Sequence, residues 1–223
     1  MIEKSKYLFV EGKNDYHLIR NLLYQHGIHS IDHEQDKNTE TIYIVDMGTK
    51  HKLDENLEIY LQYNRIQNVG IILDADQSPA STYQSCQGFI EKYGEVANWP
   101  TLQKEGISTT LIRSSRPAVS LGIWIMPNNI QTGMLEHFAS ELIPENDNLW
   151  PFAKQTISNL PEKRFPVTND ADHTRKAELH TWLAWQKEPG KPMGQAVTFK
   201  YLKSDTPTAL NFINWINNVF NNK

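Results

Sequence analysis

The chain has 223 residues, of which 39% are hydrophobic and 22% are charged, and its formal net charge is −4. This length suits one large domain, or one domain with a substantial appendage. The negative net charge argues against a strongly basic protein that coats nucleic acid. The single cysteine, Cys86, excludes an intramolecular disulfide framework and a Cys₄ zinc site. No apolar stretch approaches the roughly 20 residues that span a bilayer, and the N-terminal segment lacks the pattern of a signal peptide. We therefore expect a cytoplasmic protein with no membrane partner.

The first half of the sequence alternates between strand and helix patterns. Strands are predicted at residues 7–10, 41–46 and 69–73, and helices at residues 14–26, 53–63 and 79–93. Alternation of this kind indicates βαβ units and a parallel sheet.

The second half becomes helical after one more strong strand. A short strand is predicted at residues 109–112, a buried strand at 121–126 and a helix at 133–143; further helices are predicted at 150–160, 173–186 and 207–220, with a loop at 188–194. The fold class is therefore expected to be α/β. We predict a Rossmann-like parallel-sheet domain at residues 1–143 and a helical extension at residues 144–223, packed on the same core.

Acidic residues follow two of the predicted strands. The first strand runs into Glu11 and Gly12, and the third runs into Asp74 and Asp76. Because open α/β sheets bind ligands at the carboxyl ends of their strands, we expect these carboxylates to converge. Carboxylate oxygens attract hard divalent cations, Mg²⁺ above all, with Mn²⁺ as a substitute. The structural alternative is that Asp74 and Asp76 form an Asx turn or cap the helix that begins at Pro79.

In their order and strand context, these two motifs resemble the Toprim signature, a strand ending in Glu-Gly and a later strand ending in Asp-x-Asp. The resemblance covers roughly residues 5–140. Residues 122–127, 133–136 and 183–186 are similar to a small bacterial group of Toprim-like proteins related to OLD-type nucleases. The resemblance implies that Glu11 is a metal ligand or a general acid–base and that Asp74 and Asp76 hold Mg²⁺. It also implies that the backbone at Gly12 approaches a phosphate, which a residue without a side chain permits.

The size of the chain narrows the activities that this resemblance implies. A topoisomerase needs a nucleophilic tyrosine on a further domain, whereas Toprim recombination mediators and replicative primases need zinc modules. A compact Mg²⁺-dependent nuclease acting on DNA or RNA remains, in which metal ions would activate water and stabilise the leaving oxygen. Some relatives occur beside ATPases in phage-defence systems, and this chain has no GxxxxGK[ST] motif, so any ATPase would be a separate subunit.

Two further acids are candidates for the same edge of the sheet. Glu136 begins a helix directly after a predicted strand, so it is a candidate metal ligand. Asp15 lies one helical turn beyond Glu11 and could contact the metal ligands without binding the metal itself. Both acids have the same structural alternative, because a negative charge near a helix N-terminus is favoured by the helix dipole.

Four basic residues are candidate phosphate contacts. Lys13 could contact a scissile phosphate, and Lys176 could neutralise charge in the transition state. Arg113 and Arg116 flank a turn and are candidate phosphate-binding residues. For Lys176 a solvated helix face is the alternative. Three tryptophans at helical spacing could stack on bases, but buried core is the better interpretation: Trp182, Trp185 and Trp215.

Two other functions compete with the nuclease hypothesis. One is a phosphatase or phosphotransferase in which Asp74 is the nucleophile and Asp76 the acid. Haloacid-dehalogenase-like enzymes carry that pair on the first strand with a threonine after it, whereas here Gln77 follows a pair on the third strand. The other is a binding module without catalytic activity. The sequence leaves open the choice of DNA or RNA, the number of metals and whether the chain forms a homo-oligomer.

Overall fold

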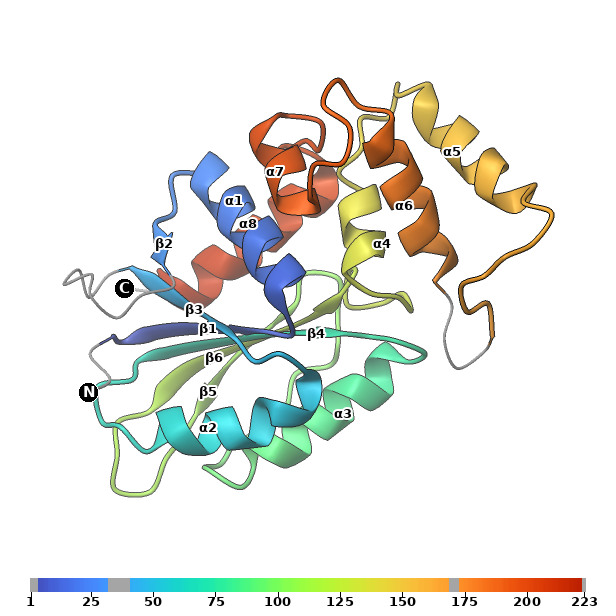
Figure 1. Ribbon diagram of the computed structural model, residues 1–223. Coiled ribbons are helices and arrows are strands. Elements are labelled where there is room, and N and C mark those ends of the chain that lie inside the picture. The colour runs from blue at the N-terminus through green and yellow to red at the C-terminus, as the bar shows by residue number, and fades with distance from the viewer. Residues whose placement is uncertain (1–3, 32–40, 169–172, 222–223) are drawn as a thin grey trace.

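The structure, a computed structural model, describes residues 4–31, 41–168 and 173–221 and is built around one six-stranded sheet (Figure 1). The strands are β1 (Lys6–Val10), β2 (Ser30–Ile31), β3 (Ile42–Asp46), β4 (Asn68–Asp74), β5 (Ile107–Leu111) and β6 (Val119–Met126). The helices are α1 (Lys13–Gln25), the 3₁₀ helix η1 (Lys50–Lys52), α2 (Leu53–Leu61), α3 (Pro79–Ile90), α4 (Leu135–Ser140), α5 (Leu149–Ser158), α6 (Thr174–Ala184), α7 (Met193–Thr198) and α8 (Pro207–Phe220).

The sheet is mostly parallel, which confirms the predicted α/β class. Its strand order is β2-β3-β1-β4-β6-β5, and every neighbouring pair runs parallel except β5 and β6. The antiparallel pair is aligned with Ile107 opposite Ile123, so β5 forms an edge that runs against its neighbours.

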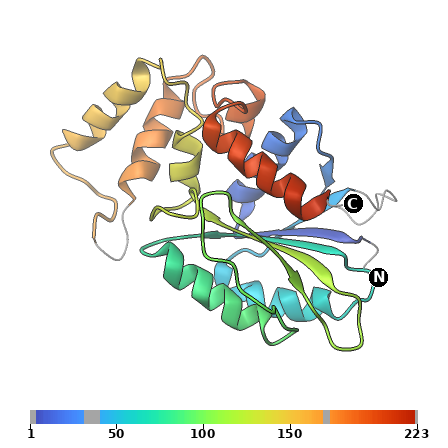
Figure 2. The same ribbon diagram turned by 180° about the vertical axis from the view of Figure 1, so that it is seen from behind.

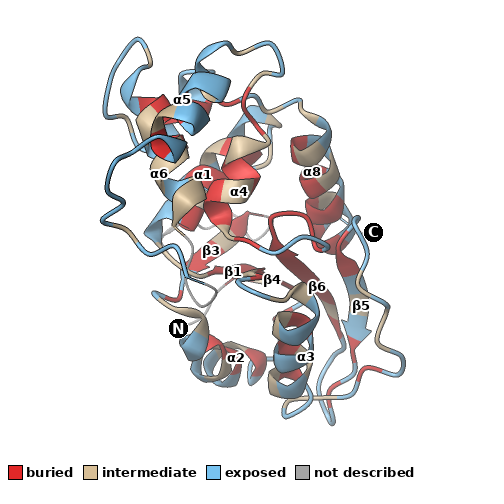
Figure 3. Cartoon of the chain, turned by 90° about the vertical axis from the view of Figure 1, so that its right-hand side faces the viewer, coloured by how far each residue is buried: buried red, intermediate tan, exposed pale blue. Residues whose placement is uncertain are grey.

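Side chains on the two faces of the sheet enter two separate cores. Along β1, Leu8 and Val10 pack with α1, α4 and the C-terminal helices, whereas Tyr7 and Phe9 pack with α2 and α3. This alternation follows from the two-residue period of a strand. Figure 2 shows the same two layers from behind, with α8 over one face and α3 over the other. In Figure 3 the strands and the helix faces turned toward them are mostly buried.

The C-terminal helix α8 rests directly on the sheet. A Cβ atom at Gly122 in β6 would lie only 2.2 Å from Val219 Cγ2, so only glycine lets the helix approach this closely. The indole of Trp215 in α8 donates a hydrogen bond to the carbonyl of Ile107 at 2.8 Å, next to the same contact. The last helix therefore shares a core with the strands.

The connections that leave the carboxyl edge diverge at the centre of the sheet. β1 leads into α1 on one face, the adjacent β4 leads into α3 on the opposite face, and β6 leads into α4 on the first face again (Figure 1). Neighbouring connections that leave on opposite faces open a crevice at the carboxyl ends of the strands, where α/β proteins bind ligands. The fold thus places a binding crevice at the ends of β1 and β4.

Three short elements were not predicted, one of which is the three-residue 3₁₀ helix η1. β2 has only two residues, and α7 has six and overlaps the end of the predicted 188–194 loop, so neither is long enough to show a hydrophobic period. α7 packs tightly on α1, because a Cβ at Gly194 would meet His17 Cβ at 2.7 Å. Among the described residues, no helix has the length and apolar character needed to cross a membrane.

Candidate functional site

Carboxylates from three elements meet at the carboxyl edge of the sheet. Glu11 follows β1, Asp74 ends β4, and Glu136 lies in the first turn of α4. Glu11 Oε1 accepts a hydrogen bond from the Asp74 backbone N–H at 2.7 Å. Asp74 Oδ1 in turn accepts one from the Leu135 N–H at 3.0 Å. These two bonds fix the carboxylates of β1 and β4 against each other and against the start of α4.

Asp15 belongs to this cluster more closely than the sequence suggested. It lies on the inner face of α1 and is 8% exposed. The backbone amides of Asp15 and Gly12 favour its charged form and partly offset the rise in its pKa. Among the charged neighbours that raise the pKa of Asp74, Asp15 has the largest effect, ahead of Glu11 and Glu136. Asp15 is therefore part of the acidic cluster itself.

Burial raises the pKa values of three of these carboxyl groups. The pKa of Asp74 rises from 3.8 to about 9, through burial first and then through the charges of Asp15 and Glu11. The pKa of Asp15 rises from 3.8 to about 7, also through burial and the nearby Glu11. Burial raises the pKa of Glu11 as well, against the opposing effect of its bond from Asp74. Several buried carboxylates in one place disfavour one another's ionisation and favour a cation or a proton among them.

Asp76 is held apart from the buried group. It is exposed and has a positive φ of 49°. Its N–H and C=O both pair with Gly133 at 3.0 Å, in an isolated bridge that joins the β4–α3 and β6–α4 connections. Its carboxylate forms an ion pair with Lys50 of η1. Asp76 thus lies at the rim of the cluster, where a lysine already neutralises it.

Lys50 is a site residue that the sequence analysis missed. Burial alone would lower its pKa, but the bond to Asp76 and the charges of Glu11 and Asp74 more than offset this and raise it. The residue follows Gly48 and Thr49 in the loop after β3, a parallel neighbour of β1. The position of Lys50 shortly after the carboxyl end of a parallel strand could have indicated its role. β3 ends at Asp46, however, and neither an Asp-x-Asp nor a Glu-Gly motif follows it.

The two predicted catalytic lysines differ in how they approach the cluster. Lys176 Nζ lies 3.3 Å from Glu136 Oε1; the Lys176 side chain is 45% exposed and that of Glu136 only 5%. α6 therefore brings a cation to the acidic group from the C-terminal extension. Lys13 is the first residue of α1 and is exposed to solvent.

Gly12 is not required by the fold. Its φ of −157° is extended backbone that any residue adopts. A Cβ at this position would meet nothing closer than Asp15 Oδ2, at an ordinary 3.7 Å. The absence of a side chain therefore leaves open space beside the cluster, at the N-terminus of α1, where backbone N–H groups favour an anion.

The donor set fits a hard divalent cation in its chemistry. Five acidic groups offer carboxylate oxygens: Glu11, Asp15, Asp74, Asp76 and Glu136. The acids outnumber the two lysines of the site, Lys50 and Lys176. Within the described ranges, no three or more His, Cys, Asp or Glu side chains are grouped as metal ligands. In this arrangement two carboxylates accept backbone hydrogen bonds and two are paired with lysines. A cation would therefore compete with Lys50 for Asp76.

Arg113 and Arg116 lie away from this site; the contacts of Arg113 leave its guanidinium no room for a phosphate, whereas phosphate binding by the exposed Arg116 stays a prediction. Arg113 is 3% exposed, and its guanidinium donates hydrogen bonds to the carbonyls of Leu61, Tyr63, Ile66 and Pro117. These acceptors lie in the segments that precede β4 and β6, at the opposite edge of the sheet from the acidic cluster. Arg113 closes the core there, and the exposed Arg116 shares its turn.

Two of the three tryptophans are core residues, as the preferred interpretation expected. Trp182 and Trp215 are 0% and 1% exposed, whereas Trp185 is 36% exposed. The indole N–H of Trp182 donates to Asp147 at 3.0 Å, which fixes α6 beside the start of α5. The ring of Trp185 lies against Phe152 of α5.

The fold and the cluster together define a mostly parallel α/β protein with a buried acidic site at the carboxyl edge of its sheet. Over residues 5–221 the chain matches the family described as "Protein of unknown function (DUF3226)". The match covers nearly the whole sequence, so the chain belongs to that family. Comparison with curated proteins and with solved structures gave no match.

Proposed function

We propose that this protein is a Mg²⁺-dependent nuclease of the Toprim type, which cleaves phosphodiester bonds in DNA or RNA. The observation that carries the proposal is a cluster of carboxylates at the carboxyl ends of β1 and β4, in which Asp15 and Glu136 are buried and Glu11 and Asp74 are partly buried. Buried acids with raised pKa values in a crevice are the mark of a functional site more than of a structural one.

The proposed roles follow from the position of each side chain. Glu11, Asp74, Asp76 and Glu136 would hold the cation, Mg²⁺ or Mn²⁺, which when bound supplies a water of lowered pKa and stabilises charge on the phosphate oxygens. Burial raises the pKa of Glu11, which makes its carboxylate a stronger base and suits it to accept a proton.

Two cations and one glycine would position the phosphate. Lys176 reaches Glu136 from solvent and can neutralise negative charge on a substrate bound beside it. Lys13, exposed at the start of α1, is available to contact the next phosphate along the backbone. Gly12 leaves room for the phosphate at the N-terminus of α1, which explains a glycine that the fold does not need.

A separate ATPase subunit is part of the same proposal. Its support is the resemblance to Toprim-like proteins of phage-defence systems, together with the lack of a GxxxxGK[ST] motif in this chain. Nuclease activity that rises when a neighbouring ATPase is added would agree with it.

The decisive experiment measures cleavage of plasmid DNA, single-stranded DNA and total tRNA with Mg²⁺, with Mn²⁺ and with EDTA. Wild type is compared with Asp74→Ala/Asp76→Ala and with Glu55→Ala/Glu58→Ala, which removes two exposed acids of α2. We expect metal-dependent cleavage by wild type and by the α2 variant, and none by the site variant.

Other outcomes point to the competing functions. Hydrolysis of p-nitrophenyl phosphate without cleavage of any nucleic acid would favour a phosphatase. Calorimetric Mg²⁺ binding that the site variant loses, with no hydrolysis of either kind, would favour a binding module. Absence of Mg²⁺ binding by wild type would refute the metal site altogether.

A further inference from the structure

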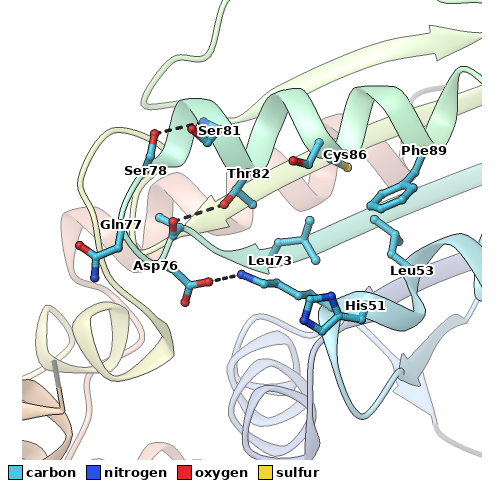
Figure 4. A pocket seen from close by; sticks show the side chains of 13 residues that line it. His51, Leu53, Leu73, Asp76, Gln77, Ser78, Ser81, Thr82, Cys86 and Phe89 are labelled. Atoms are coloured by element: carbon cyan, nitrogen blue, oxygen red, sulfur yellow. Dashed lines mark hydrogen bonds and ion pairs between the residues drawn. The ribbon is translucent and has the colours of Figure 1, made fainter. Parts of the chain in front are cut away.

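A cavity of about 420 Å³ opens beside the acidic cluster, on the face of the sheet that α2 and α3 cover. Figure 4 shows it between α3 and the start of α2, with Gln77 and Asp76 at one end and Phe89 and Leu53 at the other. Its volume falls within the range of about 300–1,000 Å³ that is usual for small-molecule sites. None of the residues proposed from the sequence lines it except Asp76.

The cavity and the acidic cluster share a boundary. Asp76 and Lys50, which form an ion pair at the rim of the cluster, both line the cavity. Asp76 is separated from Asp74 only by Ala75, whose side chain also faces the cavity. A phosphate at the cluster would therefore lie at the mouth of this cavity, and the group attached to that phosphate would be directed to it.

The lining combines an apolar interior with polar edges. Leu53, Leu73 and Phe89 supply apolar surface at the inner end. Gln77, Ser81 and Ser85 supply an amide and hydroxyls; in the described part of the chain these three side chains form no hydrogen bonds. A nucleobase has this same character, with two apolar faces for packing and a polar edge for hydrogen bonds.

We propose that this cavity receives a nucleobase of the nucleotide next to the scissile phosphate. The inference deepens the proposed nuclease function and rests on it for the position of the phosphate. Lys50 would contact the phosphate or sugar of the same nucleotide, and the serines and Gln77 would contact the edge of the base. The cavity would then make binding depend on the presence of a base and not on the sugar-phosphate backbone alone.

The test measures binding of the four nucleoside 5′-monophosphates by calorimetry in Mg²⁺, with ribose 5-phosphate as the ligand that lacks a base. Ser85→Trp places a large side chain in the cavity from an exposed position of α3. Gln84→Trp is the matched control, because Gln84 is the exposed neighbour on the same helix and does not line the cavity.

We expect wild type and Gln84→Trp to bind at least one nucleotide about tenfold more tightly than ribose 5-phosphate, the ratio that stacking of one base supplies. Ser85→Trp should lose that ratio and bind both ligands alike. Equal affinity of wild type for all nucleotides and for ribose 5-phosphate would overturn the proposal, as would unchanged nucleotide binding by Ser85→Trp. Neither measurement needs cleavage, so a protein that shows base-dependent binding without nuclease activity would refute the function and leave the cavity assignment standing.

Discussion

Replacing Asp15 by asparagine should stabilise the protein in the absence of metal. Asp15 is buried, its pKa in the folded state is about 7, and its ordinary value is 3.8. The folded state therefore holds a proton on Asp15 that the unfolded chain releases between these two pH values. Such a group contributes almost no destabilisation below pH 3.8, progressively more between pH 3.8 and about 7, and a constant amount above that, where both states are ionised.

The size of the effect follows from the pKa difference. A difference of about three pKa units, at about 1.4 kcal/mol for each, sets an upper value of roughly 4 kcal/mol at pH 8. At pH 4 the same relation gives less than about 1 kcal/mol. Asparagine has nearly the same shape and no charge, so Asp15→Asn should gain most of this free energy of unfolding at pH 8 and little at pH 4.

Urea unfolding in EDTA at the two pH values measures this difference. With a slope of about 2–3 kcal/mol/M, the midpoint of Asp15→Asn should shift upward by about 1–2 M at pH 8. Asp54→Asn is the control of opposite sign, because a bond from Lys92 lowers the pKa of the partly exposed Asp54. Its removal should slightly destabilise the protein at pH 8 and have no effect at low pH.

The reasoning would be refuted by an Asp15→Asn protein that is no more stable than wild type at pH 8, or that gains equally at both pH values. In the first case a partner would stabilise the charged carboxylate by more than burial destabilises it. In the second case the gain would come from packing. Added Mg²⁺ should stabilise wild type at pH 8, since a bound cation relieves the same repulsion, and should stabilise Asp15→Asn less.

Four other changes test the remaining assignments. Asp74→Asn should lower metal-dependent cleavage by more than about 100-fold while leaving the far-ultraviolet circular dichroism unchanged, and normal cleavage would remove Asp74 from the metal site. Lys50→Ala should raise Mg²⁺ affinity by about two- to fivefold in calorimetry, because it frees Asp76 from an ion pair; unchanged affinity would mean that Lys50 does not compete with the cation. Arg113→Met should cost at least about 3 kcal/mol in urea unfolding, since it leaves several buried carbonyls without donors, while cleavage by the folded protein stays normal. Gly12→Ala should leave the free energy of unfolding within about 0.5 kcal/mol of wild type but raise the KM for nucleic acid about tenfold, and an unchanged KM would show that no phosphate lies there.

Most of the sheet could be predicted because its strands are buried on both faces. The continuous apolar runs at β1 and β4 have no solvent-facing polar positions, which is typical of central parallel strands. β5 alternates exposed and buried residues, and its antiparallel direction depends on the path of the preceding segment, which has no regular pattern. Local sequence therefore predicted that strand but carried no information about its direction.

The acidic residues of the site could be predicted because they end a strand or lie within a few residues of a strand end or a helix start. Glu11 and Asp74 lie at strand ends, and the parallel arrangement brings them together. The roles of the basic residues were harder to predict. A basic side chain can donate to buried carbonyl groups or pair with an acid at the site, and local sequence does not distinguish the two. Arg113 was a candidate phosphate ligand but donates to buried carbonyl groups far from the site, whereas Lys50, which no sequence motif singled out, is paired with Asp76 at the site.

The contrast between Lys50 and Lys176 suggests how the site is organised. Each lysine pairs with one acid of the cluster, Lys50 with the exposed Asp76 and Lys176 with the buried Glu136. In the described part of the chain no ion pair joins a lysine to Asp15 or Asp74, and burial together with the neighbouring carboxylates raises the pKa values of these two groups. A small divalent cation could enter between them where a lysine side chain does not reach. The two lysines would then be released to the substrate as the metal takes over their acids, so that charge for binding the phosphate would become available only when the metal is in place.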